Sequence, residues 1–523
     1  MTFNGKCNFG KNYNSRSRKA NLKRGVGVVT ALSLMALSSV AQAGGKLTVA
    51  QVRDPGSWDP IDTFTLAWGS VASNLFDGLV YRGPDLKLVP GLATSWEFLD
   101  NESRIRFKLR EGVQFHNGEP FNAEAVKFTF ERLLGDEGAK GPQRSNYTSI
   151  EQIKIVDDYT VDFIMKRPDP VLITKLAGYG AMIVPPKYTA KMGEEFNLKP
   201  VGTGPFKFTS YTPSVKITFE KFEDHWRGAP KLDELVYRFI PEASTRMAEL
   251  QSGGVDVIYK VPLGSLSVFD THDNIELAPV ASPTIDSLRL KTTEGALTSD
   301  IRVRKALNMA IDRNAIIESL LGGQGKPISS LQGAGSFGYD ASLETYEYDP
   351  KKAKALLAEA GVKPGTKMTI DYRSADSDFR EVALAITSYL RMVGLEVKIN
   401  PVENSVMSKD VIPNGKTHEM YQFGWGGWTF DFDNTAYLLY HSGERYNPYI
   451  KSAKMDALLE KQRLTYDREL REEALQEVAR MAHEQALDIP LYNLNTVYGI
   501  SSRVKNFEPA PDDRLFFLNT SVE

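Results

Sequence analysis

Apolar and polar residues along this chain repeat with two different periods, which predicts short strands alternating with helices. Residues 104–109 alternate strictly between polar and apolar side chains, and this pattern predicts a half-buried strand. After Asn122, apolar residues recur every three or four positions up to Leu134, as they do on one face of an amphipathic helix. The turn Gly202-Thr-Gly-Pro205 then precedes further strands, and it is compatible with a crossing between domains.

The second half of the chain predicts a β-α-β unit. A strand that ends at Arg373 is followed by a helix over residues 378–393 and by a strand over residues 397–402. Parallel strands need such a crossover helix. Another helix is predicted over residues 350–360, because an aspartate caps it, a proline opens its first turn and a glycine follows it. With 523 residues, the chain is expected to form a mixed α/β protein of more than one domain.

The first 43 residues have the pattern of a secretory signal peptide. Residues 1–24 carry seven positive charges and no negative charge, and an apolar run over 25–40 follows. Small residues at Ala41 and Ala43 suit signal peptidase, which predicts a mature chain that begins near Gly44. The alternative is a membrane anchor, but the apolar run is shorter than the ~20 residues that span a bilayer. We therefore expect export, with a periplasmic location.

Charge and cysteine content narrow the possible partners. Removal of the seven positive charges of the leader takes the net charge from −3 to −10. This moderately acidic balance disfavours nucleic acids and anionic membranes as partners. The single cysteine, Cys7, lies inside the leader, so the mature chain is expected to have no disulfide and no thiolate metal site.

Motifs for catalysis, metals and cofactors are not found in the sequence. The six histidines never show the spacing of a helix-borne zinc site. Residues 333–338 match the glycine spacing of a dinucleotide fingerprint, but they neither follow a clear strand nor open a helix. No complete Gly-x-x-x-x-Gly-Lys-Ser/Thr phosphate loop is present, since Gly415-Lys416-Thr417 lacks the first glycine, so the chain is not expected to hydrolyse ATP. We predict no cofactor, no metal ligand and no catalytic residue.

A glycine- and tryptophan-rich segment, residues 423–434, is the main candidate for ligand contact. It contains Trp425, Trp428, Asp431 and Asp433 among three glycines. Glycines let the backbone approach a ligand closely, and ligand sites are typically lined by aromatic rings with a few fixed polar groups. The alternative is a buried aromatic turn between two elements.

Three further residues complete the predicted ligand-binding set. Arg373 ends a strand in an α/β region, where a guanidinium can hold a carboxylate through two hydrogen bonds. A surface ion pair is the alternative for a single arginine. Trp68 and Tyr147 are included as aromatic candidates for contact with the ligand.

Several motifs in order indicate a family resemblance that covers nearly all of the mature chain. The motifs are Leu88-Val-Pro-Gly-Leu-Ala-Thr-Ser-Trp-Glu97, Phe107-Lys-Leu-Arg-Glu-Gly-Val-Gln-Phe-His-Asn-Gly-Glu-Pro-Phe121, Val201-Gly-Thr-Gly-Pro-Phe206, Val303-Arg-Lys-Ala-Leu307, Ala310-Ile-Asp-Arg313 and Tyr348-Asp-Pro-Lys-Lys-Ala-Lys-Ala-Leu-Leu357. With them the chain resembles the large solute-binding proteins of ABC importers, family 5, of the dipeptide, oligopeptide, nickel and opine type. The resemblance implies capture of a small, peptide-like ligand and delivery to an inner-membrane permease, by a monomer that makes and breaks no bond.

The resemblance also implies a fold, the type II periplasmic binding protein fold in its large three-domain variant. Residues 44–84, 205–298 and 496–523 would form domain I of one lobe, and residues 85–204 would form its domain II. Residues 299–495 would form the second lobe, domain III. Closure of the two lobes would bury the ligand and present a surface to the permease.

Within this family, two positions bear on the ligand. Arg373 falls where dipeptide-binding relatives place the arginine that takes the ligand carboxylate. Trp428 falls where peptide-binding relatives have an aspartate that pairs with the ligand's amino terminus. An indole offers an ammonium group only a cation–π contact. Either Asp431 or Asp433 takes over the role, or the ligand has no free α-amine.

The sequence is also compatible with several other functions. The chain is compatible with a carrier of an opine, of a sugar-phosphate conjugate or of a nickel chelate. A periplasmic peptidase or glycosidase would need a nucleophile or a carboxylate pair in a cleft, and no residue is singled out for that role. A chemoreceptor partner or a periplasmic chaperone on the same scaffold is a further alternative.

Overall fold

The computed structural model describes residues 45–62, 65–83, 86–100 and 102–523. The predicted signal peptide and its cleavage site lie outside these residues. Within the described part of the chain, no helix is both long and apolar enough to cross a membrane.

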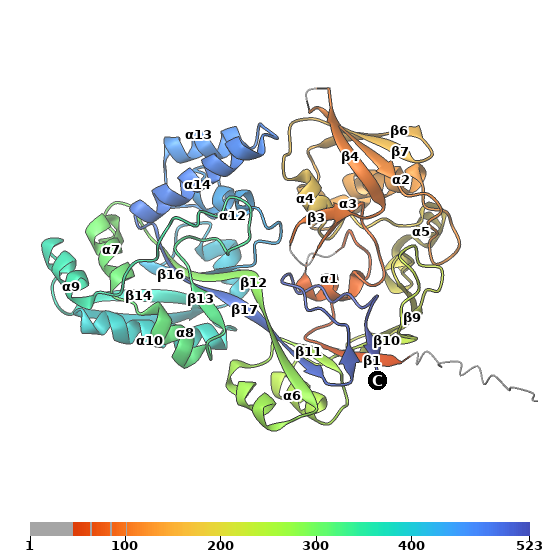
Figure 1. Cartoon of the computed structure of the whole chain (residues 1–523). Coiled ribbons are helices and arrows are strands. Elements are labelled where there is room, and N and C mark those ends of the chain that lie inside the picture. Colours follow the sequence, from red (N-terminus) through yellow and green to blue (C-terminus); the bar gives the residue numbers. More distant parts are fainter. Residues whose placement is uncertain (1–44, 63–64, 84–85, 101) are drawn as a thin grey trace, which may run out of the picture. The chain divides into compact units, whose positions relative to one another are not determined.

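One mixed sheet of eleven strands dominates the described residues (Figure 1). In spatial order its strands are β15 (Leu395–Val402), β14 (Thr366–Arg373), β16 (Met420–Trp425), β12 (Ile275–Leu290), β17 (Asp488–Ser501), β11 (Val257–Tyr259), β1 (Lys46–Gln51), β10 (Glu234–Phe239), β9 (Lys216–Lys221) and β8 (Phe206–Thr212), and β13 (Gly325–Pro327) pairs with β17 off this path.

The two longest strands, β12 and β17, join the two halves of this sheet. They pair antiparallel from Ile275↔Ser501 to Arg289↔Asp488. Between Ala281 and Ile285 the register shifts, and the extra residues form a bulge. The side-chain amide of Asn493 donates to two carbonyl groups in the bulge, those of Ser282 and Thr284, both at 2.7 Å. These hydrogen bonds satisfy backbone groups that strand pairing leaves open.

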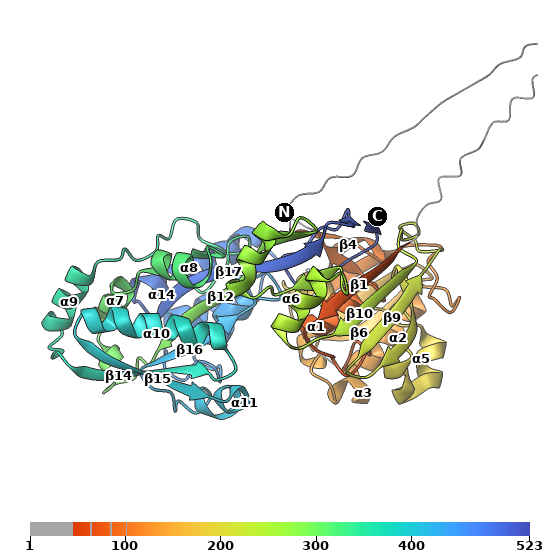
Figure 2. The same cartoon turned by 90° about the horizontal axis from the view of Figure 1, so that it is seen from below.

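The half of the sheet that contains β14, β15 and β16 is covered by helices. They are α7 (Ile301–Met309), α8 (Arg313–Leu320), α9 (Pro350–Glu359), α10 (Ser377–Met392), α12 (Phe432–Tyr440), α13 (Ala453–Gln462) and α14 (Arg468–Glu484). In Figure 2, α10 lies along β14 and β15, which pair in parallel. The predicted β-α-β unit is therefore confirmed. The helix predicted over residues 350–360 is α9, and Asp349 caps it by accepting from the backbone N–H of Lys352.

A second, four-stranded sheet stands apart from the large one. Its order is β4 (Ala93–Leu99), β5 (Arg104–Leu109), β7 (Thr160–Met165) and β6 (Ile150–Asp157). Strand β5 shows the expected half-buried pattern, and α2 (Ala123–Leu134) begins after its cap Asn122 as expected. The rings of Phe107, Phe130 and Phe163 pack together between α2 and this sheet.

The remaining α-helices and strands lie in the first 300 residues and at the C-terminus, apart from the short α11. They are α1 (Leu66–Ala72), β2 (Val80–Arg82), β3 (Leu88–Pro90), α3 (Asp136–Ala139), α4 (Leu172–Leu176), α5 (Pro186–Met192), α6 (Ala243–Gln251), α11 (Asn404–Val406), β18 (Val504–Lys505) and β19 (Ser521–Val522). The domain boundaries expected near residues 84, 204, 298 and 495 stay a prediction. Strand β17 passes residue 495 without a break, so that boundary falls inside a strand.

Candidate ligand-binding site

Four separate segments of the chain line one small cavity, which we call the site cavity. Its lining residues are Ala177, Gly178, Tyr179, Pro283, Thr284, Gly426, Trp428, Phe430, Pro511, Asp512, Asp513 and Arg514. Pro283 and Thr284 belong to the bulge of β12, and residues 426–430 follow β16. The site cavity therefore lies where the long strands join the two halves of the sheet, and aromatic rings form much of its wall.

Trp428 reaches the site cavity because it lies against a glycine. A Cβ atom added to Gly178 would lie 2.7 Å from Cζ3 of Trp428, closer than carbon atoms pack. Only glycine at position 178 therefore allows the observed position of the half-buried indole. Residues 423–434 consist of the end of β16, a loop over 426–431 and the start of α12.

Trp425 offers a buried donor next to the same loop. Its ring stacks on Phe423, with a centroid distance of 5.9 Å. Together with Asp431 and Gln332, it lines a smaller cavity, which shares Pro283 with the site cavity. Among the described residues, no acceptor lies within hydrogen-bond distance of the buried indole N–H of Trp425, and the buried Oε1 of Gln332 lacks a donor. A buried polar atom without a hydrogen-bond partner costs free energy, so both atoms favour the binding of a polar ligand group.

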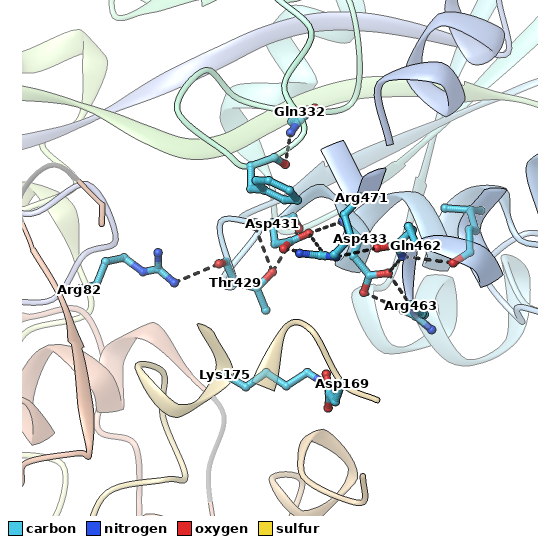
Figure 3. A network of polar contacts seen from close by, with 12 residues as sticks. Arg82, Asp169, Lys175, Gln332, Thr429, Asp431, Asp433, Gln462, Arg463 and Arg471 are labelled. Carbon is cyan, nitrogen blue, oxygen red and sulfur yellow. Dashed lines mark hydrogen bonds and ion pairs between the residues drawn. The ribbon is translucent and has the colours of Figure 1, made fainter. Parts of the chain in front are cut away.

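Asp431 and Asp433 are each paired with an arginine (Figure 3). Both oxygens of Asp431 accept from Nη2 of Arg471, at 3.1 and 2.9 Å, and Asp431 also caps α12. Asp433 accepts from Nε and Nη2 of Arg463, at 2.6 and 2.9 Å, and from the amide of Gln462. Both carboxylates are buried. In this structure their charges are balanced inside the protein.

The pKa values of these two carboxylates move in opposite directions. Burial raises the pKa of Asp431, although the charge of Arg471 opposes the shift. Burial also acts to raise the pKa of Asp433, but the charge and hydrogen bonds of Arg463 outweigh it and lower that pKa. Asp433 therefore favours its ionised form, whereas the ionisation of Asp431 depends on the charge of Arg471.

Arg373 lies at the carboxyl end of β14, as expected, but it does not line the site cavity. Its Nε donates to Oδ1 of Asn404 at 2.8 Å, and its backbone N–H donates to Oε1 of Gln422. Burial lowers the pKa of Arg373, while the charges of Asp286 and Asp376 raise it. No ion pair of Arg373 is found among the described residues. Its guanidinium is held by Asn404 only through Nε, which leaves donors for a carboxylate.

Trp68 and Tyr147 lie behind the wall of the site cavity. Both side chains are 0% exposed. The ring of Trp68, in α1, packs edge-on against Tyr179, and the hydroxyl of Tyr147 donates to the carbonyl groups of Lys175 and Tyr179 at 2.9 and 3.0 Å. They support the segment that carries Gly178 and Tyr179. Their direct contact with a ligand stays a prediction.

Several lining residues were missed by the sequence analysis. Tyr179, Phe430 and the C-terminal segment 511–514 show no periodic pattern or motif that links them. The only local signal was the Gly-Tyr-Gly sequence around Tyr179. Arg82 was also missed. Its Nη2 donates to the carbonyl of Thr429 at 3.0 Å (Figure 3). Its guanidinium lies 4.5 Å from the centre of the Phe430 ring.

The match to known families decides the class of protein. Residues 87–447 match the family model of bacterial extracellular solute-binding proteins, family 5 (middle). The chain belongs to this family. The family comprises solute-binding proteins and not enzymes, and both the expected resemblance and the α/β fold class are confirmed.

Three similar proteins illustrate the range of this family. The chain is 27% identical to a dipeptide-binding protein of Escherichia coli (strain K12) over 541 aligned positions, which cover 97% of this chain and 100% of the relative. It is 30% identical to the glutathione-binding protein GsiB of Pectobacterium atrosepticum, over 71% of this chain and 72% of the relative. A solved structure of AgaA from A. tumefaciens R10 in complex with agropinic acid has 30% identity and a TM-score of 0.73, and the match covers 92% of this chain and 99% of that chain.

Proposed function

We propose that this chain is the solute-binding component of an ABC importer, which captures a peptide-like ligand in the periplasm. The protein would act as a monomer, deliver the ligand to an inner-membrane permease and leave it chemically unchanged. The observation that carries this proposal is the meeting of Tyr179, Trp428 and Phe430, from separate segments, at the bulge that joins the two halves of the large sheet. The site cavity between them has a volume of only about 20 Å³, so these segments would have to move apart to admit a peptide-like ligand. Concave, aromatic sites with few polar groups are typical of small-molecule binding.

The two curated relatives support a peptide-like ligand. One is a dipeptide-binding protein and the other binds glutathione, and both compounds carry peptide bonds and free carboxylates. Trp428 would stack on the ligand from one side of the site cavity, and the unpartnered N–H of Trp425 would donate to an acceptor group. Arg373 would hold a carboxylate through its remaining donors.

The paired aspartates bear on the amino group of the ligand. Asp431 and Asp433 already bind Arg471 and Arg463, so a ligand ammonium would have to displace an arginine from a buried ion pair. Breaking a buried pair is costly. A ligand without a free α-amine, or with the amine against the face of Trp428, therefore fits this site better.

A carrier of an opine or of a sugar-phosphate conjugate is the second candidate. It is favoured by the solved structure with agropinic acid, which is as similar to this chain as the glutathione-binding relative. A carrier of a nickel chelate is the third. In the described part of the chain, no group of three or more His, Cys, Asp or Glu residues is placed to hold a metal ion directly.

Native mass spectrometry of the purified protein, without refolding, tests these alternatives. We expect a co-purifying organic compound that bears a carboxylate or a phosphate. Peptide fragments in its spectrum would support the first candidate, and a sugar-derived acid would support the second. Stoichiometric metal would support the third. Calorimetry with Met-Leu and agropinic acid, followed by chromatography of the recovered compounds, completes the test, since a chemically altered product would contradict a binding function.

A further inference from the structure

A larger cavity adjoins the site cavity and lies outside the proposed ligand contacts. We call it the C-terminal chamber, because residues 506–519 form much of its wall. The other lining residues belong to strand β2 with Gly83, to the 177–182 region and to the positions Ser73, Gly78, Val89, Arg227 and Lys231. Its volume is about 640 Å³, within the range of small-molecule sites.

The C-terminal chamber and the site cavity share part of their walls. The shared residues are Ala177, Gly178, Pro511, Asp512 and Arg514. The side chain of Arg514 donates to the carbonyl of Ala177 at 2.8 Å, which ties two of these segments together. A ligand held against Trp428 therefore lies close enough to extend one end into the chamber.

Basic side chains outnumber acidic ones in the C-terminal chamber. The basic residues are Arg82, Arg227, Lys231 and Arg514, and the acidic residues are Glu508 and Asp512. Asp512 is already paired with Arg514. Glu508 forms no ion pair among the described residues, so three cations face a single unpaired acid. The lining of the chamber therefore carries two more positive than negative charges, which favours an anionic ligand.

Arg227 is positioned by aromatic rings, and the charge of the buried Asp77 acts on it although no ion pair links the two described residues. Its guanidinium lies 4.0 Å from the ring centre of Tyr81 and 4.4 Å from that of Trp226. Among the described residues it forms no hydrogen bond and no ion pair. A guanidinium stacked by its face keeps its N–H edge available for a carboxylate or phosphate. Both Arg227 and Lys231 are exposed, so a ligand can reach them.

Arg82 is a second cation that forms no ion pair within the described part of the chain. Its two hydrogen bonds go to the carbonyl groups of Leu86 and Thr429. Burial and the charge of Arg514 lower the pKa of Arg82 to about 10, because Asp512 and Asp431 compensate only in part. An anion bound in the chamber would offset this repulsion.

We propose that the C-terminal chamber binds an anionic group, a carboxylate or a phosphate, at one end of the ligand that occupies the site cavity. This inference rests on the proposed function and makes it narrower, since the transported compound would carry an acidic terminal residue or a phosphorylated group. Arg227 and Lys231 contact the anion. Tyr81, Val89 and Phe516, which also line the chamber, contact the carbon chain that leads to it.

Isosteric peptide pairs test the inference with one charge changed at a time. Calorimetry would compare Ala-Ala-Glu with Ala-Ala-Gln, and Glu-Ala-Ala with Gln-Ala-Ala, on the wild type and on a variant with Arg227→Gln and Lys231→Gln. We expect the wild type to prefer the glutamate peptide of at least one pair by about tenfold or more, a typical effect of one charge-assisted contact. In the variant, the preference should fall below about threefold, while the affinity for the glutamine peptide stays within about twofold.

Arg380→Gln is the matched control, since Arg380 is exposed on α10 and paired with Glu381. It should keep the full preference. Equal affinity of the wild type for both members of each pair, or a preference that survives in the variant, would overturn the inference. Inorganic phosphate that binds as tightly as the preferred peptide would show a site for the free ion and would also overturn it.

The same experiment separates failure of the inference from failure of the proposed function. If the wild type binds Met-Leu but none of the four tripeptides and no phosphate, the chamber does not accept an anion and the binding function stands. If no peptide and no agropinic acid binds either, both the inference and the proposed function are wrong.

Discussion

The loop after β16 lines the site cavity, and the C-terminal chamber shares part of its lining with that cavity. The two regions differ in whether their charged side chains form ion pairs. In the loop, Asp431 and Asp433 are buried and paired with Arg471 and Arg463. In the chamber, Arg227 lies against aromatic rings and forms no ion pair among the described residues.

This difference distinguishes charged residues that stabilise the fold from charged residues that are available to bind a ligand. A buried ion pair is expensive to break, because removing one partner leaves the other charge buried and unpaired. An exposed cation that no carboxylate neutralises contributes little to folding, and its interaction energy remains available for a ligand. The sequence alone suggested the reverse, since it singled out the aspartates for ligand contact and passed over Arg227.

The largest effect is expected when a buried pair is broken. Arg471→Met should lower the free energy of unfolding by about 3–5 kcal/mol, because Asp431 would remain buried without its cation. Urea denaturation at neutral pH measures this loss. Adding Asp431→Asn to the variant should recover part of it. A loss of less than about 1 kcal/mol from Arg471→Met would show that the pair does not stabilise the loop.

Asp286 provides an intermediate case, a buried carboxylate with no ion pair among the described residues. Burial, and then the charge of Asp376, raise its pKa to about 7, although Gln422 donates to it and Arg373 lies nearby. Because this value exceeds the ~3.9 of an unfolded chain, folding favours the protonated form. Its stabilising contribution is complete below about pH 4 and is lost as the pH rises through about 7.

Asp286→Asn should therefore remove a pH dependence that the wild type shows. Between about pH 5 and about pH 8, the wild type is expected to lose at least about 1.4 kcal/mol more stability than the variant, since each unit of pKa shift corresponds to that energy. Urea denaturation at both pH values provides the comparison. Parallel curves for the two proteins would contradict the raised pKa.

The position of Trp428 can be tested through its contact with Gly178. Gly178→Ala should push the indole from its place, because the new Cβ would lie 2.7 Å from it. We expect ligand affinity to fall by more than about tenfold, with a stability cost of about 1–3 kcal/mol for overpacking. Gly264→Ala is the control, since no atom lies within 4 Å of its added Cβ. Unchanged affinity in calorimetry would remove Trp428 from the site.

Arg373 is expected to affect ligand binding and not folding. Arg373→Ala should weaken binding by about tenfold or more, because a charge-assisted contact with a carboxylate is lost. The melting temperature of the empty protein should stay near that of the wild type, since the side chain makes a single hydrogen bond among the described residues, to Asn404. Calorimetry and thermal melting on the same samples give both results, and unchanged affinity would exclude Arg373 from ligand contact.

The smallest change in stability is expected for the chamber. Arg227→Gln should alter the free energy of unfolding by less than about 1 kcal/mol, because it removes contacts with aromatic rings and a charge interaction with Asp77 that is not an ion pair. Urea denaturation alongside Arg471→Met gives the direct comparison. A loss as large as that of Arg471→Met would mean that Arg227 is a structural residue and not a ligand contact.

The sequence by itself determined the local elements and the family. The strict alternation in residues 104–109, the capped helix after Asp349 and the β-α-β unit around α10 follow from short-range rules, because side-chain direction and capping depend on neighbouring residues. The ordered motifs were likewise sufficient to identify the family of solute-binding proteins.

Only the tertiary structure decided which charges are paired and which residues meet at the site cavity. Asp431 is 40 positions away from Arg471 in the chain, and Arg514, which lines both cavities, lies 337 positions from the carbonyl it binds in Ala177. No periodicity links such distant residues. Their contacts arise because β12 and β17 bring separate segments together, and whether a charge is neutralised depends on the neighbours that this packing supplies.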